Sequence, residues 1–363
     1  MSKRNANSPA EKHLLPLLRD VAHASTMSLE DWDVTIRLAR KAKLLGLIAW
    51  RVNERLPLWE QLPKQVCGHL RSAINFSNQR TQAVRFELDA INKALPDHLK
   101  VIALKGAAYT LENREFSRGR LPNDVDLLVS ASNLKETEEA LLAGGWETQV
   151  VDAYDQNYYR NWSHELPPMR YPGHALEVDL HHTITPPTSR VRANTETLFK
   201  DMKPIANSRY FALHPHDQII HASIHLFQDS ELMGRLRDIV DLDAMIRASA
   251  IDPVGGNELL MRAKHHGAER HLWYAMYFCH KWLNTPVPVE TEASQPSRLT
   301  RTLMDAIFST GSLPAIQNEK TNPTLVAASI IGSLRYHWLR MPQKMLARHL
   351  GHKCLQGFSR RLS

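Results

Sequence analysis

The sequence predicts an α+β fold, in which a small mixed β-sheet with helices on one side is flanked by helical regions. Two observations lead to this prediction. In residues 98–212, short apolar segments of strand character alternate with helix-compatible segments, which is typical of an α/β unit. In residues 1–97 and 213–363, apolar residues recur at helical spacing over long stretches. We therefore expect an N-terminal helical region, an α/β core and a C-terminal helical region.

The N-terminal region is expected to contain two long helical segments. In LEDWDVTIRLARKAKLLGLIAWRVNERL, residues such as Trp32, Ile36 and Ile48 recur at roughly helical spacing, and Pro57 is expected to close the segment. Residues 64–95 contain no proline, which favours a second long helix there.

The core is expected to contain four strands. They lie in LKVIAL, DVDLLVS, WETQVV and HALEVDLHHTI. The first strand leads into Lys105-Gly106 and a helix-compatible AAYTLENREF, and the second precedes the helical NLKETEEALLAG. Ser132 is a candidate N-cap of that helix, and Gly144-Gly145 is expected to end it.

The C-terminal region is expected to be helical again. Four segments are amphipathic: HPHDQIIHASIHLFQ, RLRDIVDLDAMIRAS, GGNELLMRAKHHGAERHLWYAMYFCHKWL and TLVAASIIGSLRYHWLRMPQKMLARHL. The proline-rich residues 284–298 are typical of a linker, and the basic tail KCLQGFSRRLS is expected to be loose.

Composition and charge are those of an ordinary soluble protein. The 363 residues are 43% hydrophobic and 23% charged, with a net charge of +7, which suits a polyanion such as RNA or a nucleotide but does not require one. We find no signal peptide and no apolar run long enough for a transmembrane helix. The three scattered cysteines fit neither a disulfide framework nor a zinc motif. A cytoplasmic location without membrane contact is therefore expected.

Two aspartates one residue apart are the first sign of a binding site. Asp124 and Asp126 lie in the strand DVDLLVS, where residues two apart point to the same face. Like charges side by side cost energy unless a cation or a proton lies between them. A third acid, Asp179, lies in the strand LEVDLHH. If the two strands are neighbours, three carboxylates converge on one patch that suits Mg²⁺, with Mn²⁺ as the alternative.

These motifs resemble an uncharacterised nucleotidyltransferase-like family of the polymerase-β-type nucleotidyltransferase superfamily. The resemblance rests on ALKGAA, RLPNDVDLLV and LEVDLHH in this order, and covers about residues 95–250. The superfamily often has Gly-Ser at the turn, whereas Ala107 and Ala108 follow Gly106 here. Any phosphate contact at this turn would therefore come from backbone amides or from Lys105.

The resemblance implies a role for each matching residue. Asp124, Asp126 and Asp179 would bind the metal ions, and Asp179 would also activate the acceptor hydroxyl. Lys105, Gly106, Arg120 and His181 would bind the nucleotide, the two cations by neutralising phosphate charge. The implied reaction is Mg²⁺-dependent transfer of a nucleoside monophosphate from an NTP to a hydroxyl of a protein, an RNA or a small molecule, with release of pyrophosphate.

Each of these side chains also has a plainer interpretation. The aspartates could be solvated acids at strand ends, Lys105 and Arg120 surface cations, and Glu177 a peripheral acid. His181 could contact phosphate, orient Asp179 or simply pack. These alternatives remain open from the sequence.

Three further groups are ambiguous. His221 and His225 have the spacing of a metal-binding pair on a helix, but the sequence offers no third ligand. The group of Arg235, Arg237, Asp238 and Asp241 favours helix capping or pairing over substrate binding. The aromatic residues 154–166 could stack on a nucleobase or form an exposed connection.

Two other functions are compatible with the sequence. The chain could be a non-catalytic protein that binds a nucleotide or a partner and retains the fold, although the presence of all three carboxylates argues against a degenerate site. It could also be a basic RNA-binding module, whose binding would fall steeply with salt and would not need Mg²⁺.

Overall fold

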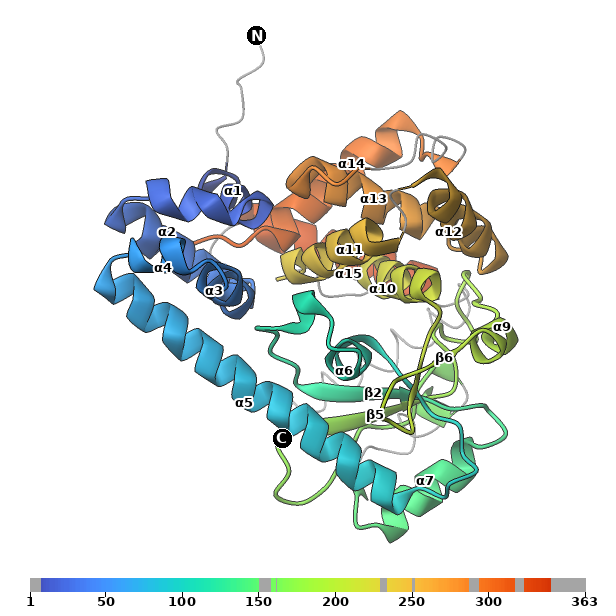
Figure 1. The fold of residues 1–363 in the computed structure, drawn as a ribbon. Helices are drawn as coiled ribbons and strands as arrows, with labels where there is room; N and C mark the ends of the chain where they lie inside the picture. The colour runs from blue at the N-terminus through green and yellow to red at the C-terminus, as the bar shows by residue number, and fades with distance from the viewer. Residues whose placement is uncertain are drawn as a thin grey trace, which may run out of the picture.

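A seven-stranded mixed sheet lies among helices from both ends of the chain (Figure 1). The computed structural model describes residues 8–149, 158–160, 162–228, 234–249, 252–286, 294–316 and 323–340. The strands are β1 (Ile102–Ala103), β2 (Asp124–Leu128), β3 (Glu147–Thr148), β4 (Met169–Arg170), β5 (Glu177–His181), β6 (Lys203–Pro204) and β7 (Phe211–Ala212). They are ordered β3-β4-β5-β2-β1-β7-β6. The α+β class predicted from the sequence is confirmed.

The two longest strands of this sheet, β2 and β5, are parallel neighbours at its centre. Asp124 pairs with Glu177 and Asp126 pairs with Asp179. The apolar residues between them, Val125 and Val178 among them, are fully buried. Because successive side chains alternate between faces, the apolar residues cover one face of the sheet and the aspartates lie on the other.

The N-terminal helices partly follow the sequence pattern. They are α1 (Leu15–Arg19), α2 (Leu29–Lys41), α3 (Leu45–Asn53), α4 (Leu56–Glu60) and α5 (Lys64–Ala94). The long α5 is confirmed. The expected segment before it is broken between α2 and α3, because Lys43 has a left-handed φ of 56°. Pro57 does not close that segment as expected: it lies in the first turn of α4, where proline is well tolerated.

The helices of the core are α6 (Lys105–Leu111), α7 (Leu134–Ala143) and α9 (Thr195–Lys200). The predicted cap at Ser132 is wrong: the N-cap is Asn133 without a side-chain bond, and the Ser132 hydroxyl contacts Ser130 and Asn133 instead. The predicted end of α7 is confirmed, because Gly144 is the C-cap and Gly145 follows with a φ of 99°.

The C-terminal region is helical, as expected. It contains α10 (Pro215–Gln228), α11 (Leu236–Ser249), α12 (Pro253–His265), α13 (Glu269–Leu283), α14 (Arg298–Ser312) and α15 (Pro323–Arg340). Gly267, with a φ of 62°, separates α12 from α13. The middle of the proline-rich segment 284–298 and the basic tail lie outside the described residues.

All three regions contribute to one continuous apolar core, which extends from Ala10 to Ala328 in sequence. The N-terminal region approaches the core especially closely at Gly46 in α3. A Cβ atom there would overlap the carbonyl oxygen of Gly119, which itself has a φ of 81°. Both positions therefore require glycine, and the contact places the loop before Arg120 against α3.

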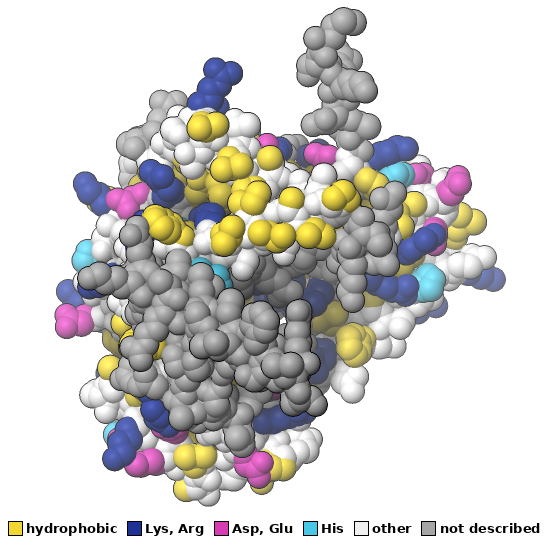
Figure 2. Space-filling model, turned by 180° about the vertical axis from the view of Figure 1, so that it is seen from behind, with side chains coloured by type: hydrophobic (Ala, Val, Ile, Leu, Met, Phe, Trp, Pro, Cys, Tyr) yellow, Lys and Arg dark blue, Asp and Glu magenta, His cyan; other side chains and the backbone are white. Residues whose placement is uncertain are grey.

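The surface shows one prominent apolar band, seen from behind in Figure 2. Helices α14 and α15 carry exposed apolar side chains, namely Leu299, Leu303, Val326, Ile330, Ile331, Leu334 and Trp338. None of the helices in the described ranges has the length and apolar character needed to cross a membrane.

Candidate active site

The three predicted acids lie on two adjacent strands. Asp126 of β2 is directly opposite Asp179 of β5, and Asp124 precedes Asp126 by two residues on the same face. Asp126 is buried, Asp179 is partly buried and Asp124 is exposed at the rim. The parallel register therefore brings together the acids that the sequence only placed on separate strands.

Asp126 is the most firmly held of the three. Its Oδ1 lies 3.0 Å from Nζ of Lys105 and 3.0 Å from Nε2 of His181. Burial opposes ionisation of Asp126, but the charges of Lys105 and His181 outweigh this effect and lower its pKa well below the ordinary value. Asp126 is therefore ionised, and neither of these contacts uses its Oδ2.

His181 is held between two carboxylates. It is 1% exposed, and its Nδ1 lies 3.6 Å from Oε2 of Glu165, opposite the contact with Asp126. Burial alone would lower its pKa, but the bond to Asp126 and the charge of Glu165 raise it. The sequence left open a phosphate contact, orientation of Asp179 or simple packing, whereas in the structure His181 contacts Asp126.

Asp124 and Asp179 differ from Asp126, because their surroundings raise the pKa of each. Desolvation and the charge of Asp126 raise the pKa of Asp124. Desolvation, Asp126 and Glu165 raise the pKa of Asp179 to about 7. A carboxylate with a raised pKa is more stable when it gains a proton or a nearby cation. The donor set of three carboxylates therefore fits a hard divalent cation such as Mg²⁺.

Two adjoining cavities open beside these carboxylates. Both are lined by Lys105, Asp124, Asp126 and His225, and their volumes are about 220 Å³ and 260 Å³. Each alone is smaller than a typical small-molecule pocket of roughly 300–1,000 Å³, but together they reach that range. We name the smaller one the basic cavity, because Lys and Arg side chains also line it, and the larger one the acidic cavity, because Asp179 and Glu165 also line it.

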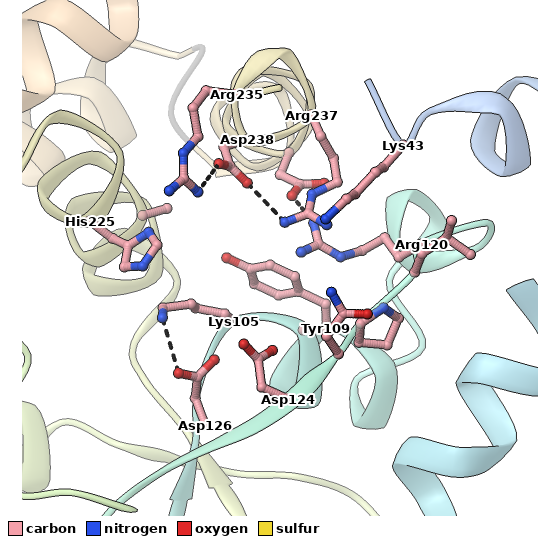
Figure 3. A pocket seen from close by; sticks show the side chains of 16 residues that line it. Lys43, Lys105, Tyr109, Arg120, Asp124, Asp126, His225, Arg235, Arg237 and Asp238 are labelled. Atoms are coloured by element: carbon pink, nitrogen blue, oxygen red, sulfur yellow. Dashed lines mark hydrogen bonds and ion pairs between the residues drawn. The ribbon is translucent and has the colours of Figure 1, made fainter. Parts of the chain in front are cut away.

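The basic cavity contains four cationic side chains in addition to Lys105. They are Lys43, Arg120, Arg235 and Arg237. Figure 3 shows these cations on the side of the cavity opposite Asp124 and Asp126, with the Tyr109 hydroxyl between them. Such a distribution, with cations facing a pair of acids, suits a ligand that carries several negative charges and a bound metal ion.

Arg120 is partly buried, with 11% of its side chain exposed, and it is not a free surface cation. It forms an ion pair with Asp241 of α11, and its guanidinium lies 5.3 Å from the centre of the Tyr109 ring. Burial and the neighbouring Arg237 lower its pKa to about 10, so it remains charged at neutral pH. Arg120 is therefore fixed in the wall of the cavity.

Arg235, Arg237 and Asp238 at the start of α11 pair with one another, Asp241 pairs with Arg120, and all of them line the basic cavity. Asp238 contacts Arg235 at 3.2 Å and Arg237 at 3.4 Å. Burial alone would raise the pKa of Asp238, but Arg237 and Arg235 lower it to about 2. Sequence reasoning did not identify Lys43 or Tyr109, because neither lies in a recognisable motif.

The acidic cavity is lined by Asp179 and Glu165 together with His164, Gln228 and Tyr336. Glu165 forms an isolated bridge with the backbone of His181, which holds it beside β5. Sequence reasoning did not identify Gln228 or Tyr336, because α10 and α15 contribute them from distant positions in the chain.

Gly106 lines the basic cavity at the start of α6. The amides of Ala107 and Ala108 donate to the carbonyl of Leu104. A Cβ atom at Gly106 would meet ordinary contacts of 3.7 Å and more. Of the two sources of phosphate contact expected at this turn, the geometry therefore favours Lys105 over the alanine amides.

The remaining predicted residues take less central positions. The rings of His221 and His225 lie 6.5 Å apart on α10, and burial lowers the pKa of His221 well below its ordinary value. Glu177 is exposed at the start of β5. In the aromatic stretch 154–166 that was a candidate for base stacking, residues 154–157 and 161 lie outside the described residues. The ring of Tyr158 packs edge-on against Tyr159 and Trp162.

Two groups of three side chains have donor atoms that all lie within 4.8 Å of one another in the described ranges. One is His164, Glu165 and His181, beside the acidic cavity, and the other is His214, His216 and Glu258. The three aspartates are not such a group.

Comparison with known proteins gives one match. A family model described as an uncharacterised nucleotidyltransferase matches residues 28–284, which is more than half of the chain and extends beyond the 95–250 expected from the motifs. No curated protein and no solved structure matches the chain.

Proposed function

The chain belongs to the uncharacterised nucleotidyltransferase family, and on this premise we propose that it transfers a nucleoside monophosphate from an NTP to a hydroxyl group. One observation supports this most strongly: the pairing of Asp126 with Asp179 in parallel register, with Asp124 two residues away on the same face. These carboxylates lie where the basic and acidic cavities meet. A reaction between a polyanion and a second substrate needs such a junction.

The triphosphate is proposed to bind in the basic cavity. Lys105 reaches this cavity from the start of α6, and Lys43, Arg235 and Arg237 face it from the helical regions. Because Arg120 is already paired with Asp241, it would contribute a fixed positive field more than a new ion pair. Nucleotidyl transfer depends mainly on positioning and electrostatics, which these side chains can supply.

Asp124, Asp126 and Asp179 are proposed to hold Mg²⁺, which when bound would neutralise phosphate oxygens and favour ionisation of the acceptor hydroxyl. Lys105 and His181 keep Asp126 ionised, and His181 fixes its orientation from the buried side. Of the three carboxylates, Asp179 borders the acidic cavity, and it is proposed to take the proton of the acceptor hydroxyl.

The acceptor is proposed to enter the acidic cavity, where Asp179 lies. Its hydroxyl oxygen forms a bond to the α-phosphorus, and the bond from that phosphorus to the oxygen bridging to the β-phosphate breaks. Pyrophosphate leaves with the bonding electrons, and the hydroxyl proton passes to Asp179. The acceptor is a protein, an RNA or a small molecule.

The test is incubation of the purified protein with Mg²⁺, an α-³²P-labelled NTP and lysate from its own cell type. Each NTP is tried in turn, and a γ-³²P-labelled sample runs beside it. Label from the α position alone is expected to reach the acceptor, with pyrophosphate as the second product. Transfer of γ label would mean phosphoryl transfer and would refute the proposal.

Variants connect the activity to the site. Asp124→Asn/Asp126→Asn protein is expected to lose transfer, as is Asp124→Asn alone, whose exposed position makes misfolding a poor explanation. Glu177→Gln removes an exposed carboxylate from the adjacent strand and is the matched control. Nucleotide binding without transfer, unaffected by the double substitution, would favour the non-catalytic alternative. RNA binding that does not need Mg²⁺ and falls with salt would favour the RNA-binding module.

A further inference from the structure

The second group of donor side chains lies apart from both cavities, where three helices meet. His214 precedes α10, His216 is in its first turn, and Glu258 comes from α12. Nε2 of His214 lies 3.7 Å from Oε1 of Glu258, and Nδ1 of His216 lies 3.6 Å from the same oxygen. All three donor atoms are within 4.8 Å of one another.

These distances are too long for hydrogen bonds, which rarely exceed 3.2 Å for nitrogen and oxygen. They are close to the separation of two ligands on one metal ion. For tetrahedral zinc, with bonds of roughly 2.0–2.2 Å, two ligand atoms lie roughly 3.4 Å apart. The two contacts with Glu258 exceed this separation by a few tenths of an ångström, which small side-chain rotations can remove.

One hydrogen bond of His216 fixes the orientation of its ring. Its Nε2 lies 2.9 Å from the carbonyl oxygen of Ser249, at the end of α11. A carbonyl only accepts, so Nε2 carries a hydrogen and Nδ1 is the ring nitrogen left to coordinate a metal ion. A backbone carbonyl that fixes the ring in this way is the usual outer partner of a zinc-bound histidine.

Nδ1 of His216 is buried and unsatisfied. His216 is 4% exposed, and within the part of the chain that the structure describes no hydrogen-bond partner reaches its Nδ1. A buried polar atom in this state costs free energy. Because Nδ1 faces Glu258, a bound cation would satisfy both groups at once.

The surroundings of the group are also compatible with a cation. The nearby Arg262 is itself paired with Asp201 and Asp217. If Nε2 of His214 binds the ion, the hydrogen of the neutral ring lies on Nδ1. Nδ1 can then no longer accept the weak 3.3 Å hydrogen bond from the amide of His216, which is a small loss.

We propose that His214, His216 and Glu258 bind one Zn²⁺ ion, with the fourth position open to water, and that this ion joins the N-terminal end of α10 to α12. Two imidazole nitrogens and a carboxylate are a ligand set that suits zinc better than Mg²⁺. The ion would bind α10 at its N-terminal end, while Ala222 and His225 further along the same helix line the basic cavity.

The test uses untagged full-length protein, freed of metal with a chelator and titrated with ZnCl₂ alone. Bound zinc is measured by elemental analysis after gel filtration, and the midpoint of thermal unfolding is recorded with and without zinc. We expect one equivalent of zinc bound at this group and a rise in the midpoint. Substitution of Co²⁺ should give the absorption bands of a tetrahedral nitrogen–oxygen site.

Substitutions assign the ion to its ligands. Glu258→Gln changes a half-exposed side chain and should leave the fold intact, while lowering zinc affinity by more than about 100-fold, because even outer partners contribute about 10–100-fold. His214→Gln should lower zinc affinity by a similar factor. Glu165→Gln removes the carboxylate from the other donor group and should retain the ion. The proposal is wrong if no zinc binds at micromolar concentration, or if Glu165→Gln loses the ion and Glu258→Gln retains it.

Discussion

Replacing Asp179 by asparagine should stabilise the metal-free protein above pH 7. Asp179 is partly buried beside Asp126 and Glu165, and desolvation together with these two charges raises its pKa from 3.8 to about 7. The folded state therefore binds a proton that the unfolded state has released. Between about pH 4 and pH 7, the stability of the wild type falls as the pH rises, because the folded state must give up this proton.

The size of the effect follows from the shift in pKa. A shift of about 3 pKa units corresponds to roughly 4 kcal/mol at most, since each unit is worth 1.36 kcal/mol. Rearrangement of the neighbouring carboxylates will reduce it, so we expect a gain of about 1–4 kcal/mol for Asp179→Asn at pH 8. At pH 4 the wild-type carboxyl is protonated and the two proteins should be nearly equal.

The assay is urea unfolding in EDTA at pH 4.5, 6 and 8. Glu177→Gln is the control, because it removes an exposed negative charge from the same strand. Because the chain has a net charge of +7, removing an acidic side chain should not by itself stabilise the protein. The reasoning would be refuted if the wild type and Asp179→Asn had equal free energies of unfolding at pH 8. It would also be refuted if these free energies differed as much at pH 4.5 as at pH 8. Adding Mg²⁺ should stabilise the wild type more than the variant.

Three further substitutions test other parts of the site. Lys43→Gln should weaken binding of Mg²⁺-ATP about fivefold, equivalent to roughly 1 kcal/mol for an exposed cation, as measured by calorimetry; unchanged affinity would exclude a phosphate contact. Asp126→Asn should lower the free energy of unfolding by roughly 3 kcal/mol, because Lys105 loses its buried partner; chemical denaturation measures this, and an unchanged value would contradict it. Gly46→Ala should cost about 1–3 kcal/mol, whereas Gly68→Ala, with open space around it, should stabilise α5; equal thermal midpoints would contradict the difference.

The sequence predicted the local features of the site well. The shared face of Asp124 and Asp126 depends only on the alternation of a strand, and the prediction of α5 depends only on the absence of proline from residues 64–95. The sequence predicts that Asp179 lies beside Asp126 only if their two strands are neighbours, because strand order and register depend on contacts between distant segments. The structure supplies this condition through the pairing of β2 with β5.

Other features could not be predicted, because they depend on tertiary contacts. The left-handed backbone of Lys43 interrupts a pattern that is otherwise continuously helical, and no residue there signals a break. Ser132 is a good N-cap by type, but its hydroxyl contacts Ser130 instead. The pairing of Arg120 with Asp241 joins residues more than one hundred positions apart, and only the packing of α11 beside the core reveals it.

The N-terminal helices belong to the site more closely than its motifs indicated. The break at Lys43 is what separates α2 from α3 and lets this residue line the basic cavity. Three residues later, the backbone of Gly46 meets that of Gly119, which directly precedes Arg120. Any shift of α3 would therefore move one cavity cation and disturb the loop that holds another. This explains in physical terms why a family match beginning at residue 28 is reasonable, although the recognisable motifs begin near residue 100.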